Sequence, residues 1–127
     1  MLVKNAIGKE LVLDIHDCDS LSKLNTEEIK KFVIELCDFI DMTRTEVHVW
    51  EYFDDPDKDP EEFYHLEGIS LIQFIKTSNI TVHTFYNSLS VSLNIFSCKD
   101  FNEIEATEFC RKWFNGEIVN SVTIPRY

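Results

Sequence analysis

Apolar and polar residues alternate along much of the chain, in stretches short enough to be strands. Residues 10–15, 45–53 and 69–76 place apolar side chains at about every second position. A period of two is typical of a strand that buries one face. The pattern predicts three strands before residue 77 and a last one over 117–124, after Gly116.

Two other stretches repeat at the helical spacing of three and four residues. The first begins behind Asn25, a residue that caps helices well. Its buried stripe is predicted to contain Ile29, Phe32, Val33, Leu36, Cys37, Phe39 and Ile40. The second is expected over 102–115 and ends at Gly116; its predicted inward residues are Ile104, Phe109, Cys110 and Trp113, with Ala106 as a further candidate.

The most informative stretch reads as a hairpin. Residues 78–85 and 89–98 alternate on either side of the polar turn Tyr86-Asn87-Ser88. With the turn centred near Asn87, antiparallel pairing places Ser78 opposite residues 96–98. We therefore expect Ser78, His83 and Cys98 to crowd one end of the hairpin, as a candidate reactive site.

The predicted order of elements is β-α-β-β-β-β-α-β. Links between successive strands are too short for parallel crossovers, so the pattern predicts a two-layer α+β sandwich. Its sheet is mostly antiparallel, with both helices on one face, and residues 1–127 form one domain. The charged loop at 54–62, which holds two prolines, is the one segment expected to be mobile.

Such a sandwich leaves one sheet face without a helix. Aromatic residues are in surplus for one buried face: Trp50, Tyr52, Phe63, Tyr64, Phe85 and Tyr86. A dimer or a ligand cleft would cover them.

Composition narrows the classes of function. The net charge of −11 argues against binding to nucleic acid, which needs clustered Lys and Arg. A cationic substrate fits this charge, although an acidic surface that maintains solubility explains it more simply. No apolar run approaches the roughly 18 residues of a membrane span, and the first residues do not resemble a signal peptide, so we expect a cytoplasmic protein.

The cysteines and histidines show no metal-binding spacing. Cys18, Cys37, Cys98 and Cys110 contain no C-x-x-C pair, and His16, His48 and His65 lie too irregularly to form a ligand set. Cys37 and Cys110 fall at apolar helix positions and are expected in the core. We expect reduced thiols and no metal site.

Four sequence elements occur in order: the stretch from Gly8 to Asp19, Gly68-Ile69-Ser70, the Ser78-x4-His83-Thr84 motif, and Phe96-Ser97-Cys98. Together they resemble the prokaryotic S-adenosylmethionine decarboxylase family. Taken alone, a serine in a turn, a histidine on a strand and a cysteine at a strand end are ordinary structural residues. The spaced set, from Gly8 to the C-terminus, favours the functional interpretation.

The resemblance implies a proenzyme that cleaves itself between Thr77 and Ser78, giving fragments 1–77 and 78–127. Ser78 would become a pyruvoyl group, the cofactor that forms a Schiff base with the substrate amine. His83 and Ser70 would assist the cleavage, and Cys98 would protonate Cα after CO₂ leaves. Tyr64 and Phe85 would lie near the adenine and the sulfonium.

The same resemblance implies a carboxy-lyase that acts on S-adenosylmethionine, on the route to spermidine. It further implies a homodimer of cleaved chains with active sites at the interface.

Five residues at three places in the sequence depart from the family pattern. Thr77 stands where the family favours Glu, Phe85-Tyr86-Asn87 stands where it favours Trp-Pro-Glu, and Glu10 replaces a His. These departures leave two alternatives open. One is a decarboxylase shifted to a basic amino acid, and the other is an unprocessed, non-catalytic paralogue that acts as a structural or regulatory subunit.

Overall fold

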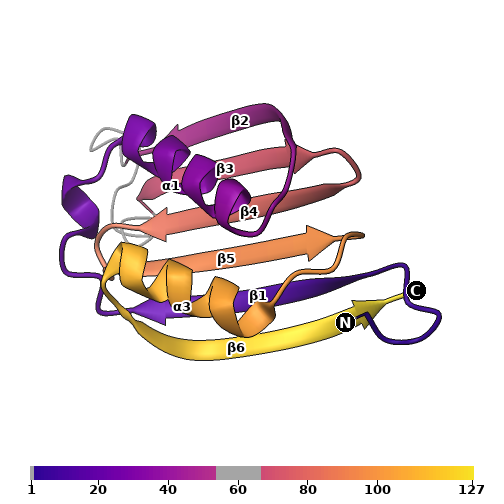
Figure 1. Cartoon of the computed structure of the whole chain (residues 1–127). Coiled ribbons are helices and arrows are strands. Elements are labelled where there is room, and N and C mark those ends of the chain that lie inside the picture. Colours follow the sequence, from indigo (N-terminus) through magenta and orange to yellow (C-terminus); the bar gives the residue numbers. More distant parts are fainter. Residues whose placement is uncertain (1, 54–66) are drawn as a thin grey trace.

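The computed structural model describes residues 2–53 and 67–127 (Figure 1). The strands are β1 (Gly8–His16), β2 (Arg44–Tyr52), β3 (Gly68–Ile75), β4 (Ser78–Phe85), β5 (Ser90–Ser97) and β6 (Glu117–Arg126). The helices are α1 (Thr26–Phe39) and α3 (Glu103–Phe114), and a 3-10 turn, η1 (Leu21–Lys23), precedes α1. The predicted order is confirmed, with η1 as an addition. The predicted loop at 54–62, and the aromatic residues Phe63 and Tyr64, lie outside the described residues.

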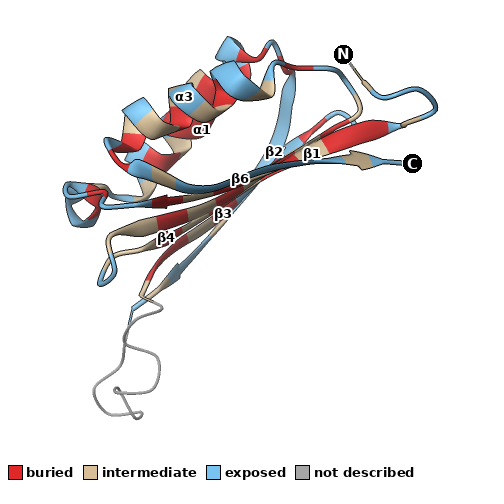
Figure 2. Cartoon of the chain, turned by 90° about the horizontal axis from the view of Figure 1, so that it is seen from below, coloured by how far each residue is buried: buried red, intermediate tan, exposed pale blue. Residues whose placement is uncertain are grey.

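The strands form one six-stranded sheet in the order β2-β3-β4-β5-β1-β6. Each neighbouring pair is antiparallel. Both helices lie on the same face of this sheet, as Figures 1 and 2 show. The predicted two-layer α+β sandwich is therefore confirmed.

The core lies between the helices and the sheet, because alternation sends every second strand residue toward the helices. The sheet contributes completely buried side chains to this core: Leu11, Leu13, Ile80, Val82, Leu93 and Ile95. From α1, Ile29, Phe32, Val33, Leu36 and Cys37 are completely buried as well. The predicted stripe of α1 is thus largely confirmed.

Both helices begin at an asparagine that caps them. The side-chain oxygens of Asn25 and Asn102 accept hydrogen bonds of 3.0 Å from the backbone N–H groups of Glu28 and Glu105. These contacts satisfy amide groups that have no partner within the helix. At its other end, α3 stops at Asn115, which adopts the left-handed conformation (φ 51°) immediately before Gly116.

Two side chains predicted to face the core do not. Ile104 is 77% exposed, whereas Ala106 and Cys110 are buried as predicted, together with Phe114. Ile104 precedes Ala106 by two residues, which is about 200° around a helix, so the two side chains cannot share a face. Phe39, at the end of α1, is 49% exposed, and its ring stacks on Phe109 of α3 at 4.8 Å.

The sheet face opposite the helices, called the open face below, is covered by none of the described elements (Figure 2). Alternation and the strand register place on it large apolar side chains that remain partly exposed. They include Trp50, Ile72, Phe74, Val122 and Ile124. An open sheet face with apolar surface is therefore present. Of the aromatic residues predicted to be in surplus, Trp50 lies on it, whereas Tyr86 packs against the core and donates a hydrogen bond to the carbonyl oxygen of Leu24.

Candidate active site

The start of β4 brings a hydroxyl and a thiol to the same peptide bond. Asn79 pairs with Phe96, so Ser78 lies beside Ser97, within the predicted range of 96–98. The Ser78 Oγ accepts a hydrogen bond of 3.0 Å from the backbone N–H of Cys98. The Cys98 thiol donates to the carbonyl oxygen of Thr77 at 3.4 Å. A buried hydroxyl and a half-buried thiol thus flank the Thr77–Ser78 bond.

A second pair lies farther along the same strand. His83 of β4 is paired directly with Ser70 of β3, and Ser70 Oγ lies 2.7 Å from His83 Nδ1. This contact uses Nδ1 and leaves Nε2 as the ring nitrogen for a reaction. Burial lowers the pKa of His83 below its ordinary value, so the ring is neutral at neutral pH. A neutral imidazole can accept a proton.

The expectation that Ser78, His83 and Cys98 crowd one end of the hairpin is wrong for His83 within one chain. Ser78 and Cys98 meet because the two strand ends pair. His83 lies five residues along β4, a distance of about 16 Å for an extended strand. Alternation also places the side chains of residues 78 and 83 on opposite faces of the sheet.

One chain therefore carries two half-sites. The first half-site is Thr77, Ser78 and Cys98, and the second is Ser70 and His83. Cys98 follows Phe96 by two residues, so alternation directs it to the open face, the face that also carries His83. Cys98 and His83 thus share the open face, whereas the buried Ser78 hydroxyl faces the helix side.

The residues predicted to contact substrate are placed only in part. The Phe85 ring stacks against His83 at 6.4 Å with an interplanar angle of 26°. Tyr64 lies outside the described residues. Asn87, which replaces an acid of the family pattern, donates from Nδ2 to Glu67 Oε2 at 3.1 Å. A carboxylate is therefore present beside position 87, on a residue that the sequence pattern did not single out.

A small cavity adjoins Ser78 on the side of the helices. It has a volume of about 170 Å³ and is lined by Asp41, Met42, Thr43, Ile75, Lys76, Thr77, Ser78 and Lys99. Lys99 Nζ is 2.8 Å from Asp41 Oδ2, which ties the end of the hairpin to the segment after α1. The sequence carries no signal for this contact, because the two residues are 58 positions apart.

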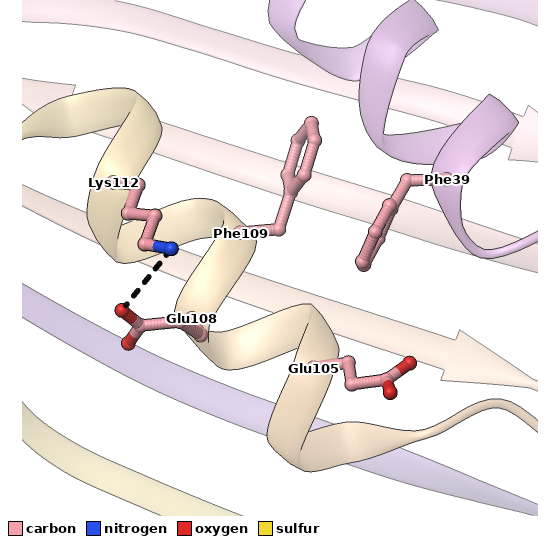
Figure 3. A pocket seen from close by; sticks show the side chains of 5 residues that line it. All are labelled: Phe39, Glu105, Glu108, Phe109 and Lys112. Carbon is pink, nitrogen blue, oxygen red and sulfur yellow. Dashed lines mark ion pairs between the residues drawn. The ribbon is translucent and has the colours of Figure 1, made fainter.

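Another cavity, of about 350 Å³, lies in the helix layer between α1 and α3. Phe39, Glu105, Glu108, Phe109 and Lys112 line it, as Figure 3 shows. These side chains include no hydroxyl or thiol, and neither half-site contributes to the cavity. We therefore assign the reactive chemistry to the sheet and not to this cavity.

The remaining cysteines are unsuited to reaction at neutral pH. Cys18, Cys37 and Cys110 are completely buried. Burial raises the pKa of Cys18 and of Cys37 to about 11, and it raises the pKa of Cys110 further.

Within the described ranges, no three His, Cys, Asp or Glu side chains are grouped so as to hold a metal ion. No helix in the same ranges is both long and apolar enough to span a membrane.

Known proteins similar to this chain were identified by sequence and by structure. Among curated proteins, the S-adenosylmethionine decarboxylase proenzyme of Saccharolobus islandicus is 23% identical over 92 residues, and that of Saccharolobus solfataricus is 22% identical. The aligned part covers 72% of this chain but only 65% and 64% of those two relatives.

Among solved structures, the adenosylmethionine decarboxylase of Aquifex aeolicus has the same fold. The TM-score is 0.73 at 15% identity, and the match covers 95% of this chain and 91% of that one. The family model for S-adenosylmethionine decarboxylase matches residues 9–127, nearly the whole chain. The chain therefore belongs to the S-adenosylmethionine decarboxylase family.

Proposed function

We propose that this protein is a pyruvoyl-dependent decarboxylase that makes its own cofactor by cleavage before Ser78, and that its substrate is S-adenosylmethionine. The observation that carries the proposal is the first half-site. There Ser78 directly follows the carbonyl group of Thr77, whose oxygen already accepts a hydrogen bond from the Cys98 thiol, and the Ser78 hydroxyl is bonded to the backbone N–H of Cys98. Family membership over residues 9–127 supports it.

Cleavage would begin with attack of Ser78 Oγ on the carbonyl carbon of Thr77. The amide C–N bond breaks, an ester forms, and the amine of residue 78 is freed. Cys98, 3.4 Å from the Thr77 oxygen, is placed to donate a hydrogen bond to the charge that develops there. A base then removes the Ser78 α-proton and the ester C–O bond breaks, so that Thr77 leaves as a carboxylate. Water replaces the nitrogen, which leaves as ammonia, and residue 78 becomes the pyruvoyl group.

A pyruvoyl ketone supplies a sink for the electron pair that remains when CO₂ leaves an α-amino acid. The residues around Ser78 suit this cofactor. Cys98 is half-buried, unlike the other three cysteines, and it lies at the bond where the group would form. Its thiol can deliver a proton to the substrate Cα and recover one from water.

The base for α-proton removal is best supplied by a second copy of the chain. Within one chain, His83 is about 16 Å from Ser78, far beyond the reach of a proton transfer. Two copies packed through their open faces could bring His83 and Ser70 of one against Cys98 and the backbone of residue 78 of the other. A two-fold axis repeats this contact, so the homodimer would contain two composite sites.

The open face has the composition that such a dimer requires. Exposed Ile72 and Phe74 on one half of the sheet and Val122 and Ile124 on the other would lose contact with water. Burial of apolar area contributes roughly 25 cal/mol per Å² to association before the entropic cost is subtracted.

Side chains near the second half-site suit a cationic nucleoside. The Phe85 ring beside His83 could attract a sulfonium by a cation–π interaction of about 0.5–2 kcal/mol. Glu67, held by Asn87, could accept hydrogen bonds from ribose hydroxyls in place of the acid missing at position 87. These features favour S-adenosylmethionine over a simple basic amino acid.

The proposal is tested by trapping the substrate on the cleaved chain. Purified protein is incubated with S-adenosylmethionine and then with borohydride, while CO₂ release is followed. We expect a substrate-sized mass increase on fragment 78–127, and neither cleavage nor adduct with Ser78→Ala. The Cys98→Ala variant should release CO₂ at least ~10²-fold more slowly, the scale for loss of a general acid. A cleaved chain that is labelled by arginine or lysine instead would identify a shifted substrate.

A further inference from the structure

One buried lysine is tied to the segment that carries Cys98. Lys9, at the start of β1, keeps only 7% of its side chain exposed, and its side chain lies on the face that packs against the helices. A buried ammonium is costly unless it is fully paired. Every hydrogen bond found for this one goes to residues 100–103: Asp100 Oδ1 at 2.8 Å, Glu103 Oε2 at 2.8 Å and the carbonyl oxygen of Phe101.

The contacts are strong enough to keep Lys9 charged. Burial alone would lower the pKa of Lys9, but the hydrogen bonds to Asp100 and Glu103 raise it above its ordinary value. The hydrogen bond from Lys9 also lowers the pKa of Asp100 to about 2. The Lys9 Nζ lies 4.7 Å from the centroid of the Phe101 ring, which adds a cation–π contact.

These contacts involve the residues that immediately follow Cys98 in the chain. Asp100 is two residues after Cys98. Gly8, the neighbour of Lys9, lies in close contact with Ser97 and Cys98, at the turn that follows β5. A Cβ on Gly8 would lie 2.4 Å from the carbonyl oxygen of Ser97 and 3.1 Å from the Cα of Cys98. Strand β1 therefore holds the turn after β5 by close backbone contact and by the Lys9 ammonium.

Cleavage would remove the other contacts that hold Cys98. In the intact chain, its N–H and its thiol bond to Ser78 Oγ and to the carbonyl of Thr77. After cleavage the hydroxyl is consumed, and Thr77 is a free chain end. The contacts from Lys9 do not involve the cleaved bond and would persist.

We propose that Lys9 is a positioning residue, which holds the Cys98 thiol toward the substrate Cα after the chain has been cleaved. This inference rests on the proposed function. The proposed role has a specific chemical consequence. A Cys98 thiol that is not held in position can protonate the cofactor carbon instead of the substrate Cα. That error leaves an N-terminal alanine on fragment 78–127 and releases the substrate as an aldehyde, so the enzyme is inactivated.

The test compares Lys9→Met with wild type and with Lys30→Met. Methionine fills the buried space without charge. Lys30→Met removes one cation and its ion pair with Glu27 from α1, so it controls for charge. In Lys9→Met we expect normal cleavage, a kcat lower by about tenfold with KM within twofold, and a several-fold higher fraction of alanine-ended fragment per turnover. Alkylation of Cys98 by iodoacetamide should also be several-fold faster.

Rescue and fold controls make each outcome informative. Lys9→Arg retains the charge and should restore most of the lost kcat. If Lys9→Met fails to fold, Asp100→Asn weakens the same contact from a side chain that is 43% exposed, and it should show the same pattern. Wild-type kcat, alanine fraction and alkylation in a folded variant would overturn the inference alone. A wild-type chain that never cleaves would overturn the proposed function, and the inference with it.

Discussion

His83 is the residue whose protonation should control cleavage. Its pKa lies below the ordinary value of 6.5 because burial disfavours the charged ring, and Ser70 occupies its Nδ1 atom. If neutral His83 removes the Ser78 α-proton, the cleavage rate should stay constant from pH 8 down to about pH 6.5 and should decline only below that value. The rate can be followed on denaturing gels after refolding of unprocessed chain.

The same group links stability to pH. Between its lowered pKa and 6.5, the unfolded chain binds a proton that the folded chain does not, so this contribution to stability is present above pH 6.5 and is lost as the pH falls. A cleavage rate that already declines well above pH 6.5 would show that His83 is not the base. The variant Ser70→Ala removes the hydroxyl that contacts His83 Nδ1, and it is the matched comparison for the pH dependence of cleavage.

Among the elements, the pairing of β3 with β4 positions the second half-site. Gly68 begins β3, and a Cβ at this position would lie 1.7 Å from the carbonyl oxygen of Thr84 and 3.1 Å from its Oγ1. The backbones can pair this closely only because residue 68 is glycine. Ser70 and His83 are partners in the same ladder, so its register determines their contact.

Gly68→Ala should therefore force the two strands apart. We expect a loss of about 1–3 kcal/mol in the free energy of unfolding, the usual scale of overpacking. Cleavage should slow as well, because the hydrogen bond between Ser70 and His83 would be strained. Urea denaturation and the gel assay measure the two effects, and unchanged values in both would show that the close approach does not matter.

The strands could be predicted from the sequence, and so could the first half-site, because both depend on short-range alternation and on one hairpin. The side-chain contacts of Ser78 and Cys98 follow directly from that register. In α3, Ile104 is the residue predicted wrongly, whereas Ala106 and Cys110 are buried as predicted. Ile104 lies in the first turn, and its apolar character alone does not show which face of the helix packs on the sheet.

Contacts between distant segments could not be predicted. The hydrogen bonds of Lys9 to residues 100–103 join positions more than 90 residues apart, and no sequence pattern near Gly8 predicts them. The separation of His83 from Ser78 follows from strand geometry, but its interpretation as part of an active site depends on the second chain proposed above. A single sequence specifies such a partner only through the surplus of apolar residues on the open face.

For the whole molecule, the split of the half-sites predicts complementation between two inactive variants. Ser78→Ala retains Ser70 and His83, whereas His83→Ala retains Ser78 and Cys98. When the two are co-expressed, each mixed dimer would contain one complete composite site. About half of the His83→Ala chains should then be cleaved if pairing is random, and none when that variant is expressed alone.

Affinity tags of different size on the two variants identify which chain is cut. The Ser78→Ala chain should remain whole in the mixture. Cleavage of His83→Ala by itself, or its failure to cleave in isolated mixed dimers, would contradict the composite site. Sedimentation of the wild type should show a species of at least twice 14.9 kDa.

Self-cleavage at the Thr77–Ser78 bond is the central claim, and the mass of the purified wild-type chain under denaturing conditions tests it most directly. We predict two fragments, residues 1–77 and 78–127, and the second should carry a ketone in place of an amine at its first residue. Brief borohydride treatment should increase the mass of that fragment alone, by two hydrogens. A single species of 14.9 kDa after prolonged incubation at neutral pH would contradict the account and would identify the chain as an unprocessed member of its family.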